Sequence, residues 1–130
     1  MGKIGLIAVC NPNNPTGTWI DGDRLKSFLD SLPRETLVVV DEAYGQFAPW
    51  SALSLLDEDR SLVVSRTYSK TWSMAGARLG YLVGPRWLVS ELDKVVLPYH
   101  LDSLKQAAGR VALRFTDDMN ERVAQLVAER

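Results

Sequence analysis

Short apolar runs alternate along the chain with segments of helical periodicity. The runs at 4–9, 37–40, 62–65 and 79–83 are bounded by turn-forming or polar residues, which predicts four buried strands. The run at 37–40 contains no polar residue, so both faces of that strand are expected to be covered. Strands that alternate with helices predict an α/β fold with a four-stranded, mostly parallel sheet and flanking helices.

Apolar residues at three- and four-residue spacing predict the helices. Asp21 is the expected N-cap of the first helix, and Pro33 ends it. The apolar stripe of this helix is expected to consist of Leu25, Phe28, Leu29 and Leu32. Further helical segments are expected as a turn at 53–57 and helices at 87–95, at 101–115 and from a cap at Thr116 onward.

Composition narrows the class of protein. The 130 residues suffice for one modest domain, and a net charge of −1 without a basic run argues against nucleic acid or an anionic membrane as partner. No apolar stretch approaches the roughly 20 residues that span a bilayer. A single cysteine fits a reducing, cytoplasmic environment, and one histidine without ligand spacing disfavours a metal site. The four tryptophans are expected to be packing residues.

Three polar residues follow the ends of three different predicted strands. Asn14, Asp41 and Lys70 lie in the loops after the first, second and third strand. Ligands of α/β sheets bind beyond the carboxyl ends of the strands, so these loops are expected to form one site.

The residue types in these loops suit a covalently held pyridoxal phosphate. The Lys70 amine condenses with an aldehyde, and an aspartate such as Asp41 keeps a pyridine nitrogen protonated. The Tyr44 phenol and the Asn14 amide are expected to hydrogen-bond the ring hydroxylate. The phosphate-binding candidates are Thr67, Ser69 and Arg78.

Each residue also has a plainer interpretation. Asp41 serves equally as a strand-end cap and Asn14 as a turn former. Hydroxyls such as those of Thr67 and Ser69 commonly bond to backbone. Tyr44 is equally suited to the edge of a core. The combination with Lys70 favours the cofactor interpretation.

Four motifs resemble those of class I/II aminotransferases, which are fold type I pyridoxal phosphate enzymes. They are NPNNPTG at 11–17, DEAY at 41–44, RTYSK at 66–70 and AGARLGY at 75–81. Within that family, residues 97–101 and 106–108 are most similar to histidinol-phosphate aminotransferases.

The resemblance implies a role for each candidate. Lys70 would bind the cofactor covalently and move a proton between the substrate Cα and the cofactor C4′, while Asp41 would pair with the pyridinium nitrogen. Asn14 and Tyr44 would bond the ring oxygen, and the peptide before Pro15 is expected to be cis. The phosphate would be held by Thr67, Ser69 and Arg78. Three strands are expected to be parallel and the last antiparallel.

The resemblance also implies substrates and a domain arrangement. Histidinol phosphate would be the amino donor and 2-oxoglutarate the acceptor, in histidine biosynthesis, within a homodimer. Residues 1–130 would form only part of the cofactor-binding large domain. The N-terminal part, with its glycine-rich phosphate loop, and the C-terminal small domain are expected to be absent.

Two other functions fit the same residues. One is a sister activity, an aromatic aminotransferase or an amino-acid phosphate decarboxylase. The other is an inactive, truncated homologue that acts at most as a cofactor-binding or interaction module. The second is suggested by the missing half of the site and by sheet edges that are expected to remain unpaired.

Overall fold

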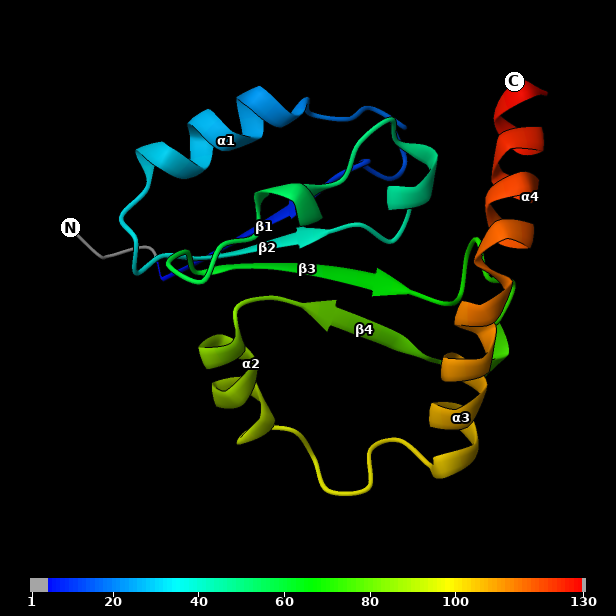
Figure 1. Cartoon of the computed structure of the whole chain (residues 1–130). Coiled ribbons are helices and arrows are strands. Elements are labelled where there is room, and N and C mark those ends of the chain that lie inside the picture. Colours follow the sequence, from blue (N-terminus) through cyan, green and yellow to red (C-terminus); the bar gives the residue numbers. More distant parts are fainter. Residues whose placement is uncertain (1–4, 130) are drawn as a thin grey trace.

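A four-stranded mixed sheet forms the centre of the computed structural model, which describes residues 5–129. The strand order is β1-β2-β3-β4; β1, β2 and β3 are parallel and β4 is antiparallel to β3 (Figure 1). The strands are β1 Leu6–Cys10, β2 Leu37–Asp41, β3 Leu62–Thr67 and β4 Gly80–Val83. The α/β class and the predicted strand directions are confirmed, although the predicted start at Ile4 lies outside the described residues.

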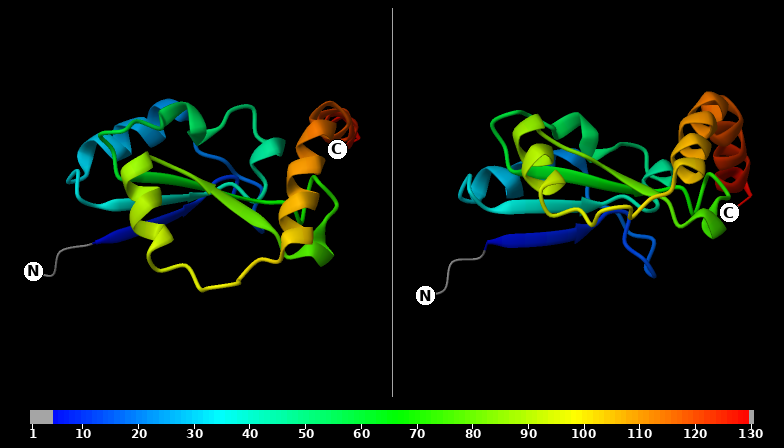
Figure 2. Two further views of the ribbon diagram at one scale, coloured as in Figure 1. Left: turned by 60° about the horizontal axis from the view of Figure 1, so that its bottom comes forward. Right: turned by 90° about the horizontal axis from the view of Figure 1, so that it is seen from below.

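Helices flank the sheet and extend past one of its ends. They are α1 Gly22–Ser31, α2 Arg86–Asp93, α3 Ser103–Ala112 and α4 Thr116–Ala128. Short 3-10 turns occur at Gly45–Phe47, Ala52–Leu55, Ala75–Ala77 and Leu113–Phe115. Helix α1 lies on one side of the strands and α2 on the other, while α3 and α4 lie beyond the carboxyl ends of β2 and β3 (Figures 1 and 2). No described helix combines the length and apolarity that crossing a membrane requires.

Helix α1 begins and packs as its sequence predicts, except at Phe28. The Asp21 side chain accepts a hydrogen bond from the Arg24 backbone nitrogen at 2.9 Å, which confirms it as the N-cap. Leu25 and Leu29 are buried against the sheet, and Leu32 packs beside them. Phe28 is 39% exposed, because it lies at the edge of the stripe that these leucines form.

The main core covers one face of the sheet. Alternate residues of β2 and β3 point toward α1 and the 52–55 turn, and the most buried of them are Val38, Val40, Leu62 and Val64. On the other face Val39 is only partly buried, and Leu6 of β1 is 58% exposed. The expectation that β2 is covered on both faces is therefore met on one face only.

A second, aromatic core joins β4 to the C-terminal helices. It consists of Tyr68, Trp72, Leu79, Met119 and Val123. Helix α3 approaches it through Gly109, whose carbonyl accepts a hydrogen bond from the Tyr68 hydroxyl at 3.2 Å. A Cβ at Gly109 would lie 2.6 Å from Leu79 Cδ2, so only glycine permits this approach without a shift of Leu79.

The apolar stripe expected for the helix at 101–115 is wrong for four of its five members, which are Leu101, Leu104, Ala108, Val111 and Phe115. Ala108 is exposed, and Leu104, Val111 and Phe115 are 81%, 49% and 54% exposed, because α3 packs through its small residue Gly109 instead. The cap predicted at Thr116 is also wrong. Thr116 has helical dihedral angles, and its hydroxyl donates to the Leu113 carbonyl at 2.7 Å. The cap position of α4 is instead held by Phe115, whose φ of −107° and ψ of 30° are not helical.

Candidate functional site

The loops that follow β1, β2 and β3 meet at one edge of the sheet. The register pairs Cys10 with Asp41 and Asp41 with Ser65, so the three parallel strands end side by side. This edge carries Asn14, Asp41 and Lys70, as the strand pattern predicts.

Buried Asn11 attaches the first loop to β2. Its backbone nitrogen donates to the Asp41 carbonyl at 2.9 Å, and its side-chain oxygen accepts from the Ile20 nitrogen at 2.8 Å. The Asn14–Pro15 peptide is cis, which confirms the expectation, and the Asn11–Pro12 peptide is cis as well. Asn11 was not among the predicted site residues, although an asparagine directly after a strand is a signal for such an anchor.

Asn14 and Tyr44 line one pocket of about 250 Å³. Its other lining residues are Pro12, Asn13, Pro15, Gly17, Trp19 and Phe47. Trp19 was expected to be a packing residue, yet it is 47% exposed and forms part of this wall. Trp19 and Phe47 are thus site residues that the sequence analysis missed, since aromatic residues in loops carry no signal that separates a wall from a core.

Lys70 and Tyr44 come into contact although they follow different strands. The Lys70 Nζ lies 5.1 Å from the centroid of the Tyr44 ring, within the range of a cation–π interaction. Lys70 is exposed and Tyr44 is half-buried. The structure therefore brings a primary amine beside a phenol that borders the pocket.

Asp41 projects from the end of β2. Its Oδ1 accepts a hydrogen bond from the Ala43 backbone nitrogen at 2.8 Å, and the side chain is exposed. This contact matches the plainer interpretation as a strand-end cap. A carboxylate has a second oxygen, so the cap orients Asp41 without using up its capacity to accept a ligand proton.

The phosphate-binding candidates differ in their surroundings. The Thr67 hydroxyl accepts from the Ser69 nitrogen at 3.0 Å and donates to the Leu79 carbonyl at 3.4 Å, as the backbone-bonding interpretation expects. Arg78 is exposed, and no ion pair joins it to another residue between 5 and 129. Its φ of 50° is left-handed, a strained conformation for arginine that often marks functional sites.

A buried ion pair that the sequence analysis missed lies behind the site. Glu42 is 1% exposed, and its Oε2 accepts from Arg66 Nη2 at 2.7 Å and from Arg66 Nε at 3.0 Å. Burial alone would lower the pKa of Arg66, but the hydrogen bonds and charge of Glu42, with a smaller effect of Tyr81, raise it. The signal was present in the alternation, because Glu42 continues the buried row of Val38 and Val40.

The family model for aminotransferase class I and II matches residues 2–130. The chain belongs to the class I and II aminotransferases. Among relatives, it is 43% identical over 132 residues to the aromatic amino acid aminotransferase of Corynebacterium jeikeium and 47% identical over 128 residues to the histidinol-phosphate aminotransferase of Mycobacterium sp. (strain KMS).

The chain spans about a third of the length of these aminotransferases. The two alignments cover 98% and 96% of the chain but 35% and 33% of the relatives. The crystal structure of histidinol-phosphate aminotransferase from Sinorhizobium meliloti in complex with pyridoxal-5'-phosphate superposes with a TM-score of 0.84 at 32% identity. That superposition covers 92% of this chain and 33% of the other.

Proposed function

We propose that this chain forms the pyridoxal phosphate-binding part of an aminotransferase that uses histidinol phosphate as amino donor and 2-oxoglutarate as acceptor. The observation that carries the proposal is the contact between Lys70 and Tyr44 beside the pocket that Asn14 also lines. The Sinorhizobium meliloti relative, whose structure contains pyridoxal-5'-phosphate, supports the choice of cofactor.

The donor set at this edge of the sheet fits that cofactor. It offers an amine for an aldehyde, a carboxylate for a ring nitrogen, and a phenol and an amide for a ring oxygen, from Lys70, Asp41, Tyr44 and Asn14 respectively. An exposed arginine without an ion-pair partner among the described residues, Arg78, is suited to a phosphate. When bound, pyridoxal phosphate supplies an electron sink that stabilises negative charge at the substrate Cα.

The chain's own residues then divide the work. Lys70 holds the cofactor covalently and moves a proton to and from the substrate Cα. Asp41 keeps a proton on the ring nitrogen, and Tyr44 and Asn14 orient the ring through its oxygen. The phosphate would be anchored by Thr67, Ser69 and Arg78.

The domain and assembly proposals rest on the family. Residues 1–130 would be part of the large domain, completed in a full-length enzyme by a further part of that domain, a small domain and a partner subunit. Aminotransferase activity is thus proposed for the whole protein to which these residues correspond, since the chain spans about a third of its relatives.

The second candidate is an aromatic amino acid aminotransferase. Relatives with that name match 98% of the chain, which is as complete as the match to the histidinol-phosphate aminotransferases. The L-threonine-O-3-phosphate decarboxylase structure is 20% identical, so that resemblance shows a shared fold alone. An inactive homologue that only binds the cofactor stays a third possibility to test.

Covalent trapping tests the cofactor proposal. The chain is mixed with pyridoxal phosphate, reduced with borohydride and digested, and the modified lysine is located by peptide mass. We expect the adduct at Lys70, and we expect Lys70→Ala to lose it. Lys105→Ala is the control, because the Lys105 side chain is 41% exposed and lies on α3. An adduct spread over several lysines and unchanged in Lys70→Ala would contradict the proposal.

Donor choice is tested on the cofactor-loaded whole protein to which these residues correspond, since this chain spans about a third of its relatives. Histidinol phosphate or L-phenylalanine is added in turn, and the change in visible absorbance is followed. We expect histidinol phosphate to react faster, with release of the cofactor in its amine form. A faster response to L-phenylalanine would favour the aromatic aminotransferase, and no response to either would favour the inactive homologue.

A further inference from the structure

We propose that Glu42 and Arg66 are positioning residues that hold the ends of β2 and β3 in one fixed relation. Through them Asp41 and the segment from Thr67 to Lys70 would keep the separation that the cofactor requires. This inference rests on the proposed function, but it concerns residues that lie outside the set assigned to contact the cofactor.

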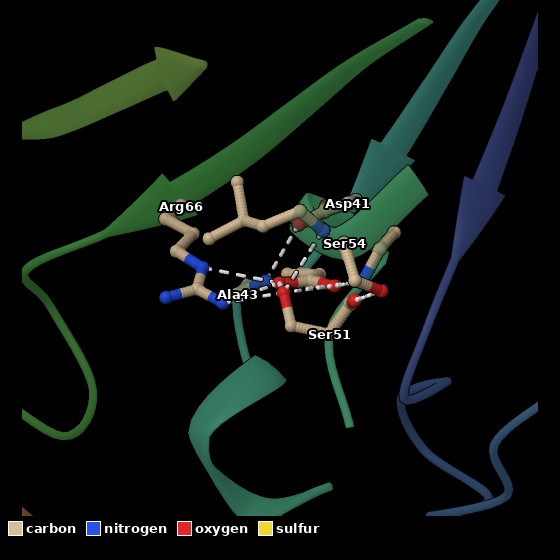
Figure 3. Close-up of polar contacts among 8 residues, drawn as sticks. Asp41, Ala43, Ser51, Ser54 and Arg66 are labelled. Atoms are coloured by element: carbon tan, nitrogen blue, oxygen red, sulfur yellow. Dashed lines mark hydrogen bonds and ion pairs between the residues drawn. The ribbon is translucent and has the colours of Figure 1, made fainter. Parts of the chain in front are cut away.

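The pair connects three segments of the chain. Arg66, from the end of β3, donates two hydrogen bonds to Glu42 Oε2 and one, from Nη2 at 2.8 Å, to Ser51 Oγ. Glu42 Oε1 accepts from the Ala52 backbone nitrogen at 2.6 Å. Ser51 Oγ donates to Glu42 Oε2 at 2.8 Å and accepts from the Leu53 nitrogen at 3.1 Å. Figure 3 shows the Arg66 side chain reaching from β3 toward Ser51, with Asp41 nearby.

Strand alternation places this pair back to back with the candidate site. Glu42 continues the row of Val38 and Val40, and Arg66 continues the row of Leu62 and Val64, all on the face under α1. Asp41 directly precedes Glu42 and Thr67 directly follows Arg66, so the side chains of Asp41 and Thr67 point to the opposite face. Each partner of the pair is separated from a site residue by one peptide bond. A shift of Glu42 or Arg66 therefore also moves Asp41 or Thr67.

The loop around Glu42 has no space in which to adjust. A Cβ at Gly45 would lie 2.8 Å from Glu42 Cβ and 2.9 Å from Glu42 Oε2. The Gly45 nitrogen donates to the Glu42 carbonyl, and the Glu42 nitrogen donates to the Ser65 carbonyl, both at 2.9 Å. The backbone and the side chain of Glu42 are thus hydrogen-bonded both to β3 and to the segment from Gly45 to Ala52.

Stability alone does not account for an ion pair at this position. The rows that it continues are apolar, and an apolar pair of similar volume is often as stable as a buried ion pair or more so. What an ion pair adds is direction, because a guanidinium and a carboxylate bond only in a narrow set of orientations. The ends of β2 and β3 need a defined relative orientation in order to present Asp41 and Lys70 to one ligand.

The first test measures cofactor attachment in folded variants. We expect Glu42→Gln and Arg66→Met to bind pyridoxal phosphate at Lys70 about tenfold more weakly than the unchanged chain, because loss of a supporting residue typically costs that much. Arg66→Lys keeps the positive charge but loses the paired hydrogen bonds, so its affinity for pyridoxal phosphate should lie between those of Arg66→Met and the unchanged chain. In the bound state, the pH midpoint of the visible absorbance should shift, because a displaced Asp41 no longer protects the ring proton.

Two controls separate this role from general destabilisation. Asp30→Asn breaks an ion pair beside the other end of β3 and should leave both cofactor affinity and the pH midpoint unchanged. The double variant Glu42→Gln with Arg66→Met removes both charges. It should regain much of the stability that the single variants lose, whereas the pH midpoint of its visible absorbance should stay shifted. Variants that bind like the unchanged chain, with the same midpoint, would overturn the proposal.

A second test does not depend on the cofactor. Amide hydrogen exchange reports on the bond from the Ala43 nitrogen to Asp41 Oδ1, which orients the Asp41 carboxylate. We expect the Ala43 amide to exchange about tenfold faster in Arg66→Lys, with the Val39 amide unchanged, as in a local opening. Unchanged exchange at Ala43 would overturn the positioning role, whereas absence of any Lys70 adduct in the unchanged chain would instead count against the proposed function.

Discussion

An arginine forms an ion pair beside each end of β3, and the two pairs differ in burial. Before the strand, Arg60 pairs with Asp30 of α1, and their side chains are 30% and 42% exposed. At its end, Arg66 pairs with Glu42, and their side chains are 15% and 1% exposed. Water screens the first pair, whereas the second must satisfy its charges within the protein.

The same pairing chemistry therefore has two different consequences. Asp30 also binds Lys26 of its own helix at 2.6 Å, so either partner is replaceable by another partner or by water. Glu42 has no such reserve, because Arg66, Ser51 and the Ala52 nitrogen occupy its oxygens. Location relative to the sheet, more than the residue types, decides whether an arginine–carboxylate pair is structural, functional or dispensable.

The largest effect is expected when one partner of the buried pair is removed. Arg66→Met leaves the Glu42 carboxylate without its charge partner, which should lower the free energy of unfolding by about 3 kcal/mol. Urea denaturation followed by circular dichroism measures this. Arg60→Met is the matched control and should change the midpoint far less. Equal losses in the two variants would show that burial does not distinguish the pairs.

Removing both charges sharpens the comparison further. We expect Glu42→Gln with Arg66→Met to be more stable than Arg66→Met alone by about 1 kcal/mol or more, because no unpaired charge remains. The glutamine still offers an oxygen to the Ala52 nitrogen. Denaturation of the two single variants and the double variant completes a thermodynamic cycle. An additive double variant would mean that the two side chains act independently.

Arg78 extends the comparison to an exposed arginine without an ion-pair partner among residues 5–129. Its left-handed φ of 50° suits glycine, so Arg78→Gly should raise the free energy of unfolding by about 1 kcal/mol. The same change should weaken the binding of pyridoxal phosphate, since it removes a proposed phosphate ligand. Thermal unfolding and cofactor titration of one variant measure both effects. A loss of stability would show that the arginine side chain, rather than the backbone, dominates there.

The smallest effect is expected for the pH dependence of the exposed pair. Hydrogen bonds from Lys26 and then Arg60 hold the pKa of Asp30 below its ordinary value of 3.8. A depressed carboxyl pKa stabilises the folded state above the unfolded pKa, and this stabilisation is lost as the pH falls through the folded value. Asp30→Asn should therefore differ from the unchanged chain near neutral pH and converge with it in acid. A constant difference down to the lowest pH would contradict this assignment.

Local signals identified most of the fold. The strand positions and the Asp21 cap are confirmed, because short apolar runs and caps depend on neighbouring residues. The antiparallel last strand, which the family resemblance implied, is confirmed as well. The helical stripes were less reliable, as Leu104 and Phe115 show. Periodicity shows that a helix has an apolar face, but not which of its faces finds a partner.

The sequence offered candidate residues for the site but not the contacts that support them. The cofactor-binding roles of Asn14, Asp41, Tyr44 and Lys70 stay predictions, and the structure shows that Lys70 lies beside Tyr44 and that Tyr44 and Asn14 line the same pocket. Trp19, Phe47 and the Glu42–Arg66 pair were missed. A pocket wall and a buried ion pair arise between segments at least 15 residues apart, a separation at which spacing carries little information.

By itself, the sequence determined the elements, their alternation and the chemistry available at the strand ends. These follow from periodicity, from caps and from the reactivity of single side chains, all of which act over a few residues. The alternation placed Glu42 in one row with Val38 and Val40, but only the tertiary structure decided that this row lies under α1 and that Arg66 pairs with Glu42 there. Strand register made that decision, because a residue's face depends on which strand it is paired with and which helix covers it.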